Sequence, residues 1–260
     1  MNYKGQGYEV DVVEAQEIDG GKEHAKRVME SIKDVIPEAT INLKEHKVTA
    51  FHTSVDAINV SLTGSLMMAY QRAYEQLKKD SVALITSAGN SGKDGVSALA
   101  WHNKSIAVAS GRYTKHDGYF IPSYSSRGEQ VDITCIPRDG VAGTSHASPV
   151  FTGVYILLKQ RLEANGYNKS MNEIVKMLYD NAMRIESVSS ESQGKGVAIL
   201  PKDIYPKDVE GHWGEEALKW MIDKGYMTGY DDGLMYPDKP MTRAMYAQAK
   251  YNEAKKRGEA

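Results

Sequence analysis

The residues best suited to do chemistry lie in a short run of small and polar side chains at residues 143–149, GTSHASP. The apolar pattern of residues 150–162 predicts a long helix, so Ser145 falls where that helix begins. A helix N-terminus offers free backbone N–H groups and a partial positive charge. A serine there can act as a nucleophile whose oxyanion product those N–H groups stabilise. The simpler interpretation is a buried helix capped by Ser145 or Thr144.

This run resembles the nucleophile motif of the subtilisin-like serine peptidases, Gly-Thr-Ser-x-Ala-Ser-Pro. Other blocks resemble further segments of that family and occur in the family's order: residues 56–64, 87–92, 123–128, 131–133 and 194–197. An ordered series of motifs is more specific than any single motif. The resemblance covers roughly residues 8–200. It implies a serine peptidase with a three-layer α/β fold, in which helices cover both faces of a parallel sheet.

The resemblance implies roles for individual residues. Ser145 is the nucleophile, and its backbone N–H and the Asn90 side chain hold the oxyanion. His24 starts a predicted helix, as the family's catalytic histidine does, although Ala25 and Lys26 replace the Gly and Thr of the family's motif. The simpler interpretation of His24 is a solvated residue at a helix start. The residues that resemble the family's substrate-binding segments are Ser61, Leu62, Thr63, Gly64, Ser87, Ala88 and Gly89.

The acid of the implied triad is expected just after the first strand. Aligning residues 10–14 with that strand puts Glu14 where the family has an Asp. A glutamate can orient a catalytic imidazole, so we expect Glu14 to be the acid. Asp19, in a predicted turn, and Asp11, on the strand itself, are the alternatives, as is a site without an acid.

The chain has seven histidines, so other candidates for the general base exist. His46 and His52 lie in a region that is shorter than in the family. His146, next to the nucleophile, is expected to be a specificity or surface residue. His102 and His116 fall in predicted loops.

Strand and helix patterns alternate along the first two thirds of the chain. The apolar runs predict strands over residues 8–15, 40–45, 57–62, 82–87, 106–110 and 131–136, and helices over 22–35, 66–79, 145–164 and 171–184. Apolar strands between helices predict a parallel sheet covered on both faces. Ligands of such sheets bind beyond the carboxyl ends of the strands, where Ser61 and Asn90 fall. The connection at residues 46–55 is shorter than an ordinary parallel crossover, so the cleft wall should be reduced there.

Composition limits the partners of the chain. With 260 residues, 41% of them hydrophobic, it can form a sizeable core in one or two domains. A net charge of −2 gives no reason to expect nucleic acid, and no apolar stretch is long enough to span a membrane. The N-terminus lacks the apolar core of a signal peptide. The single cysteine, Cys135, excludes an intrachain disulfide and is expected to be a buried strand residue. No cofactor is expected; the family resemblance allows calcium, but no metal site is identified.

The last sixty residues resemble one S-layer homology (SLH) module. Its hallmarks are the Asp-Val-x-x-His-Trp pattern at 208–213, the Gly-Tyr-x-Asp-Gly pattern at 229–233 and Thr-Arg-Ala at 242–244. The resemblance implies binding to an anionic secondary cell-wall polysaccharide, with Trp213, Gly229 and Arg243 as ligand contacts. An Arg can pair with acidic groups and a Trp can stack on sugar rings. The simpler interpretation is a small helical cap on the protease domain, with Trp213 in its core.

We therefore expect a peptidase domain over residues 1–200 and an SLH-like module over residues 201–260. The expected function is serine endopeptidase activity on a polypeptide substrate, with the module tethering the enzyme to the cell wall. The alternative is a subtilisin-fold binding or scaffold protein without turnover, attached to the wall. Either function would place the chain at a cell surface or on a virion.

Overall fold

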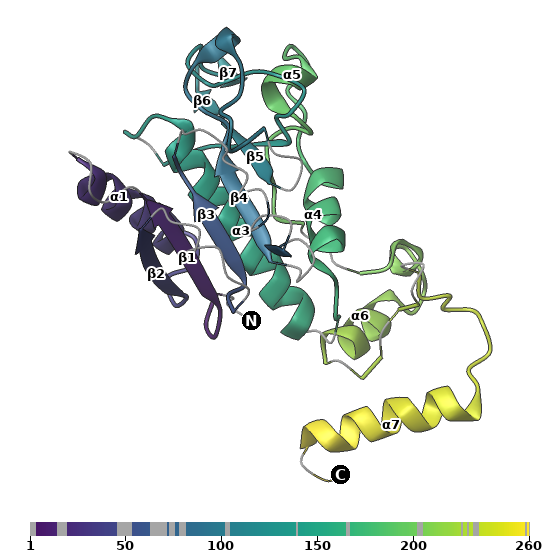
Figure 1. Ribbon diagram of the computed structural model, residues 1–260. Coiled ribbons are helices and arrows are strands. Elements are labelled where there is room, and N and C mark those ends of the chain that lie inside the picture. The colour runs from purple at the N-terminus through teal and green to yellow at the C-terminus, as the bar shows by residue number, and fades with distance from the viewer. Residues whose placement is uncertain are drawn as a thin grey trace. The chain divides into compact units, whose positions relative to one another are not determined.

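The computed structural model of the chain describes residues 4–14, 20–45, 54–62, 72, 76, 77, 82–101, 105–138, 140–164, 167–201, 205–224, 226, 227, 229, 230, 234–257 and 259. The chain divides into two compact units (Figure 1). The first comprises Met1–Leu158 and Ser170–Leu200, and the second comprises Lys159–Lys169 and Pro201–Ala260. The second unit thus takes in a short segment that lies within the domain predicted over residues 1–200.

The first unit is an α/β structure built on a parallel sheet, as the sequence predicts (Figure 1). The described residues form six strands in the order β2-β1-β3-β4-β5-β8. Each neighbouring pair is parallel. The strands are β1 (Glu9–Glu14), β2 (Thr40–Glu45), β3 (Ala57–Val60), β4 (Ala83–Ser87), β5 (Ile106–Ser110) and β8 (Ile133–Cys135). The carboxyl ends of these parallel strands therefore meet at one edge of the sheet.

The remaining elements of the first unit are helices and a hairpin. The hairpin β6–β7 (Arg112–Thr114 and Gly118–Phe120), which the sequence reading did not predict, follows β5 directly. The helices are α1 (Gly21–Lys33), α3 (Thr144–Ala164), α4 (Met171–Asp180), α5 (Ser190–Gln193) and the 3₁₀ turn Gly92–Asp94. The predicted helix over residues 66–79 lies almost entirely outside the described residues, as does most of the short connection at 46–55.

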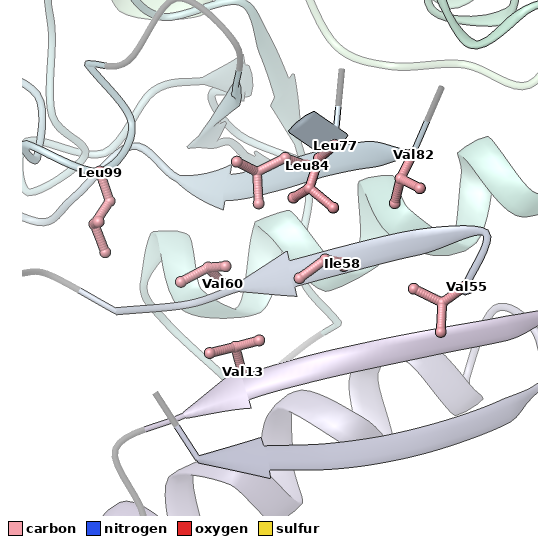
Figure 2. Packing of buried hydrophobic residues seen from close by; sticks show 8 residues of the cluster. All are labelled: Val13, Val55, Ile58, Val60, Leu77, Val82, Leu84 and Leu99. Carbon is pink, nitrogen blue, oxygen red and sulfur yellow. The ribbon is translucent and has the colours of Figure 1, made fainter. Parts of the chain in front are cut away.

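Neighbouring side chains of β3 point to opposite faces of the sheet, so this strand packs against other elements on both faces. Ile58 and Val60 belong to an apolar cluster with Leu77 (Figure 2). The other members of this cluster are Val13, Val55, Val82, Leu84 and Leu99. Asn59, which lies between Ile58 and Val60, instead faces α3, where its Nδ2 donates to Thr152 Oγ1 at 3.0 Å.

Helices α1 and α3 lie side by side through a close approach at Gly153. A Cβ built on this glycine would lie 2.5 Å from Cβ of Val35, two residues beyond the end of α1, so a larger residue would displace the segment that follows α1. Helix α1 carries His24 and α3 carries Ser145, the two residues expected to act together.

Helix α4 ends at Asp180, four residues earlier than the predicted helix. Tertiary pairing explains the difference, since Met183 leaves the helix to exchange two backbone hydrogen bonds with Val197. Val197 is also bridged to Thr134 of β8, so the segment that closes the first unit is attached to the sheet.

The second unit has its own small core. It contains the 3₁₀ turn Lys207–Val209 and the helices α6 (Glu215–Asp223) and α7 (Arg243–Arg257). Val209, Ile222 and Met235 form the buried cluster of this unit, packed against Tyr167, Tyr205, Leu218 and Met227. None of the helices in the described part of the chain is long and apolar enough to cross a membrane.

Candidate active site

Ser145 lies in the first turn of α3, as the sequence predicts, in a position fixed by the preceding residue. The Thr144 backbone N–H and hydroxyl both donate to Asn90 Oδ1, at 2.9 and 3.1 Å. In return, the Gly89 N–H donates to Thr144 Oγ1 at 3.1 Å. The segment after β4 and the start of α3 are therefore joined by three hydrogen bonds. Thr144 itself was not predicted as a site residue, although it lies inside the nucleophile motif.

The Asn90 amide has a defined orientation. Its oxygen accepts from a backbone N–H, which only an acceptor can do, so its Nδ2 must point the other way. A Cβ built on Gly143 would lie 3.7 Å from that Nδ2 and 3.9 Å from Ser145 N. Both donors therefore border the same small space, which Gly143 leaves open. With a φ of +113°, this position also strongly favours glycine.

Tyr124 holds the loop that leads to the nucleophile. The Gly143 N–H donates to the Tyr124 hydroxyl at 3.1 Å, and that hydroxyl also contacts Ser110 Oγ at 3.0 Å. The end of β5 is thereby tied to the loop before α3. Sequence reasoning placed Tyr124 in a family-like block but gave it no role.

The Ser145 hydroxyl donates to the Ser61 carbonyl oxygen at 3.2 Å. A hydroxyl has one hydrogen, so in this rotamer it is not shared with a base. The Ser145 carbonyl oxygen lies 3.1 Å from Ser61 Oγ. That carbonyl is free of a helical partner because the residue four positions on is Pro149, which has no N–H. The end of β3 and the first turn of α3 are thus held together by two hydrogen bonds, one in each direction.

A buried polar network supports this contact from below. Ser61 Oγ faces two acceptors, Asn59 Oδ1 at 2.9 Å and the Ser145 carbonyl, and lies 3.0 Å from Ser148 Oγ. Since the Ser61 hydrogen goes to an acceptor, the Ser148 hydroxyl must donate to Ser61. Thr152 completes the network by donating to the Ser148 carbonyl at 3.0 Å. A satisfied network of this kind fixes the position of α3 on β3.

His24 and Glu14 are brought together by the β1–α1 connection. Glu14 is the last residue of β1. His24 lies in the first turn of α1, where its backbone N–H donates to the Gly20 carbonyl oxygen. His24 Nδ1 lies 3.2 Å from Glu14 Oε1. The Glu14 side chain is 1% exposed, whereas that of His24 is 28% exposed. The approach does not have hydrogen-bond geometry, since both Glu14 carboxylate oxygens are buried without a hydrogen-bond partner among the described residues. Nε2 of His24 takes no part in this contact.

The other candidate acids are placed elsewhere. Asp11 is buried on β1, where Asn42 Nδ2 donates to its Oδ1 at 3.1 Å. Asp19 lies outside the described residues. Of the three acids considered, the structure therefore places Glu14 beside His24.

His146 is not a surface residue: it is 7% exposed, because the first turn of α3 directs its side chain toward α1. Its ring centroid lies 6.1 Å from that of His24. Burial lowers the pKa of His146, and the positive charges of His24, Arg27 and Arg138 lower it further. The ring contact also shows that His24 lies next to the turn that carries Ser145.

Among the remaining histidines of the first unit, only His116 lies in the described part of the chain. His46, His52 and His102 lie outside the described residues. His116 is at the exposed tip of the β6–β7 hairpin, where its Nδ1 lies 2.7 Å from Asp117 Oδ1.

The two predicted substrate-binding segments differ in what they can offer. Ser61 and Leu62 follow the end of β3, while Thr63 and Gly64 lie outside the described residues. The residues Ser87, Ala88 and Gly89 are buried. The Ala88 N–H donates to Val108 O and the Gly89 N–H to Thr144, so neither can bind a peptide strand. The N–H groups of Ala88 and Gly89 are therefore already engaged within the fold.

The structure also bears on cysteine chemistry and on metal binding. Cys135 is buried in β8, and burial raises the pKa of its thiol, which keeps it protonated and unreactive. Within the described part of the chain, no three or more His, Cys, Asp or Glu side chains gather as they would around a metal ion.

In the second unit, Trp213 is 92% exposed and so is not part of the core. Its ring lies beside that of His212, with the centroids 5.4 Å apart. The Gly214 N–H donates to His212 Nδ1, so Nε2 carries the hydrogen and donates to Asp238 Oδ1 at 3.1 Å. The His of the Trp-containing motif thus orients the loop that presents Trp213.

The other two predicted ligand contacts of the SLH-like module differ in exposure and packing. Arg243 is exposed in the first turn of α7. Gly229 packs tightly, because an added Cβ would lie 3.0 Å from the Leu234 carbonyl oxygen. Gly229 thus has a packing role. Asp208, which the sequence reading did not single out, accepts hydrogen bonds from the N–H groups of Met235 and Tyr236.

Comparison with known proteins agrees with the division of the chain into two units. Residues 207–245 match the family model of the S-layer homology domain. A "Cellulosome-anchoring protein" of Acetivibrio thermocellus is 32% identical over 75 residues. The match covers 29% of this chain and 16% of that protein, so the chain spans about a sixth of the curated relative's length.

Solved structures resemble the fold of the first unit. A lanthipeptide protease superposes with a TM-score of 0.62 at 18% identity, covering 75% of this chain and 86% of that one. The prenylagaramide maturation protease PagA gives 0.63 at 17% identity, covering 74% and 91%. A protease from Pseudoalteromonas arctica gives 0.60 at 16% identity, covering 76% and 89%. The chain thus has a subtilisin-like fold and an S-layer homology domain.

Proposed function

We propose that the chain is a subtilisin-type serine endopeptidase that its S-layer homology domain tethers to cell-wall polysaccharide. The observation that carries the catalytic part is the meeting of the Glu14–His24 pair with the first turn of α3. Glu14 and His24 lie ten residues apart in sequence, and the His24 ring lies beside that of His146, the neighbour of Ser145. This arrangement supports an acid, an imidazole and a hydroxyl that act together. The solved structures that share the fold include a lanthipeptide protease and a maturation protease, which supports a polypeptide substrate.

In the proposed reaction, Glu14 accepts the Nδ1 hydrogen of His24 and leaves Nε2 as a base. The Ser145 hydroxyl turns from the Ser61 carbonyl toward Nε2, loses its proton there and attacks the peptide carbonyl carbon. The Ser145 N–H and Asn90 Nδ2 receive the oxyanion in the space beside Gly143. The His24 imidazolium then protonates the leaving amine. Water hydrolyses the acyl-enzyme by the same steps, with His24 again as the base.

Substrate would bind along the end of β3. Backbone groups after Ser61 are the candidates for pairing with an extended peptide, as an added strand. Residues 87–89 would form the opposite wall of the cleft without hydrogen-bonding the peptide backbone through their N–H groups.

A fluorophosphonate probe tests the catalytic proposal without knowledge of the natural substrate. We expect the probe to label wild-type protein at Ser145, and the Ser145→Ala variant to remain unlabelled. Ser189→Ala, at a serine remote from the site, serves as the matched control and should label normally. A well-folded wild-type protein that resists the probe would instead favour the alternative, a subtilisin-fold scaffold without turnover.

The tethering proposal concerns the second unit and is tested separately. The exposed Trp213 ring offers a stacking surface for a sugar, and Arg243 offers a charge for an anionic group. The full chain should sediment with purified cell wall, and the Trp213→Ala, Arg243→Ala double variant should not. Trp220→Ala, at a half-exposed Trp of the same unit, is the control. Unchanged sedimentation of the double variant would refute this assignment.

A further inference from the structure

A second buried imidazole lies against the proposed base and has no part in the reaction described above. His146 follows Ser145 on α3, and its ring meets that of His24 at an interplanar angle of 58°. The His146 ring is largely withdrawn from water, whereas that of His24 is partly exposed. A polar ring in such a position calls for a partner, because burial without a hydrogen bond is costly.

The partner of His146 is Ser31 on α1. His146 Nδ1 lies 3.5 Å from Ser31 Oγ, and the Ser31 hydroxyl donates its one hydrogen to the Arg27 carbonyl at 2.9 Å. Ser31 can therefore only accept from the ring, which assigns the hydrogen of neutral His146 to Nδ1. This contact links the nucleophile helix to the helix that carries His24.

The charges around His146 are positive. Helix α1 contributes Arg27 and, when it is protonated, His24. The segment after β8 contributes Arg138. The carboxylates on this side, Glu30 and Asp34, are bound to Arg138, at 3.4 and 3.2 Å. A proton on His146 would thus be added to a site that already repels positive charge.

We propose that His146 is a positioning residue whose protonation inactivates the site, in addition to the protonation of His24. In its neutral form it holds α1, and with it His24, against the nucleophile turn. In its protonated form it keeps the Nδ1 hydrogen that faces Ser31, but its added positive charge opposes the imidazolium that His24 must become during attack. The competent enzyme then needs both rings neutral. This inference rests on the proposed role of His24 as the base.

The first test is the rate constant for fluorophosphonate labelling of Ser145, measured from about pH 4 to pH 9. Two protons block the wild-type site, so the logarithm of its rate constant should rise with pH at a limiting slope of two in acid. His146→Gln should reduce that slope to one, while the matched His116→Gln variant should keep it at two. A wild-type slope of one throughout, or a slope of two retained by His146→Gln, would overturn the inference.

The second test does not depend on catalysis. Nuclear magnetic resonance titration of the histidine rings in the full chain should show that His24→Gln raises the protonation constant of His146 by at least about threefold. That is the effect in water of removing one charge about 6 Å from another. An unchanged constant overturns the inference, even if Ser145 labels. A raised constant in protein that never labels would support the coupling of the two rings and refute the peptidase proposal.

A third variant guards against misfolding of His146→Gln. Arg138 is half-exposed, so Arg138→Gln should leave the fold intact while removing one of the charges that face His146. We expect the His146 titration to move to higher pH, and the slope-two region of labelling to begin at higher pH with it. A labelling profile identical to that of wild type would contradict the proposed coupling.

Discussion

The two sides of the proposed active site are built differently. On the nucleophile side, hydrogen bonds join three segments around Gly143 and Ser145, through Asn90, Thr144 and Tyr124. On the base side, His24 is held to Glu14 by one polar contact, at the end of one strand and the start of one helix. Particular residues are thus required where backbone groups take part in the proposed chemistry. Sequence variation is tolerated where only one side chain must be positioned.

This difference explains why the two sides differ in how well the sequence reveals them. Gly143 must adopt a positive φ and leave space for an oxyanion, and Pro149 frees the carbonyl that Ser61 approaches. Such requirements leave a recognisable motif. The base side requires a histidine in the first turn of α1 and a carboxylate at the end of β1, so Ala25 and Lys26 can replace the family's residues.

The largest expected effect concerns the base. His24→Gln should lower the rate constant of fluorophosphonate labelling by about 10²–10⁴-fold, the contribution of a general base. The matched substitution His116→Gln, at an exposed ring remote from α3, should leave the rate constant unchanged. A His24→Gln variant that labels at the wild-type rate would show that another group takes the Ser145 proton.

The next effect isolates the oxyanion donor. Asn90→Asp keeps an oxygen for the two Thr144 hydrogen bonds but replaces the Nδ2 donor with an acceptor. Losing one such donor costs about 10²–10³-fold in rate, so turnover of a peptide substrate should fall by at least that factor. Asn90→Ala would in addition loosen Thr144. Equal activity of the Asp variant and wild type would remove Asn90 from the proposed mechanism.

A third prediction concerns a partly buried carboxyl group beside the sheet, outside the proposed site. Asp132 lies just before β8, where it accepts from the Ala107 N–H at 2.8 Å, and burial raises its pKa to about 6. The folded state therefore binds this proton more tightly than the unfolded state, whose carboxyl titrates near 4. The protonated form stabilises the fold below about pH 4, and this contribution is lost as pH rises toward 6.

The expected size of that loss is about 3 kcal/mol in the free energy of unfolding, from a difference of about two pH units. Asp132→Asn keeps an oxygen for Ala107 and cannot ionise, so its stability should not show this decline. Denaturant unfolding of both proteins between about pH 4 and pH 7 measures the difference. Parallel curves would show that Asp132 does not titrate in this range.

The smallest expected effect is that of Gly143→Ala. Forcing a residue with a side chain into a positive φ should cost about 1–2 kcal/mol in the free energy of unfolding. The added methyl group would also fill the space between Asn90 Nδ2 and Ser145 N, so labelling should slow at the same time. Gly140→Ala is a suitable control. It also has a positive φ but has no heavy atom of another residue within 4 Å of its built Cβ. Equal labelling of both variants would mean that the space beside Gly143 is not used.

The sequence by itself determined the parallel α/β fold, the start of α3 at the nucleophile motif and the separate C-terminal module. These follow from local patterns: nearly continuous apolar strands between helices, a helix start marked by small and polar residues, and turn-rich motifs around Trp213. Strand β5 has the predicted bounds, because Ile106–Ser110 is a continuous apolar run between polar loops.

Tertiary structure alone decided which distant residues meet. It placed Glu14 beside His24 and gave Asp11 to Asn42. It also buried His146 against α1 rather than leaving it at the surface. No local pattern encodes these contacts, since they depend on the order of strands in the sheet and on the packing of α1 against α3. The chemistry of each residue is fixed by its type, but its partner is set by the fold.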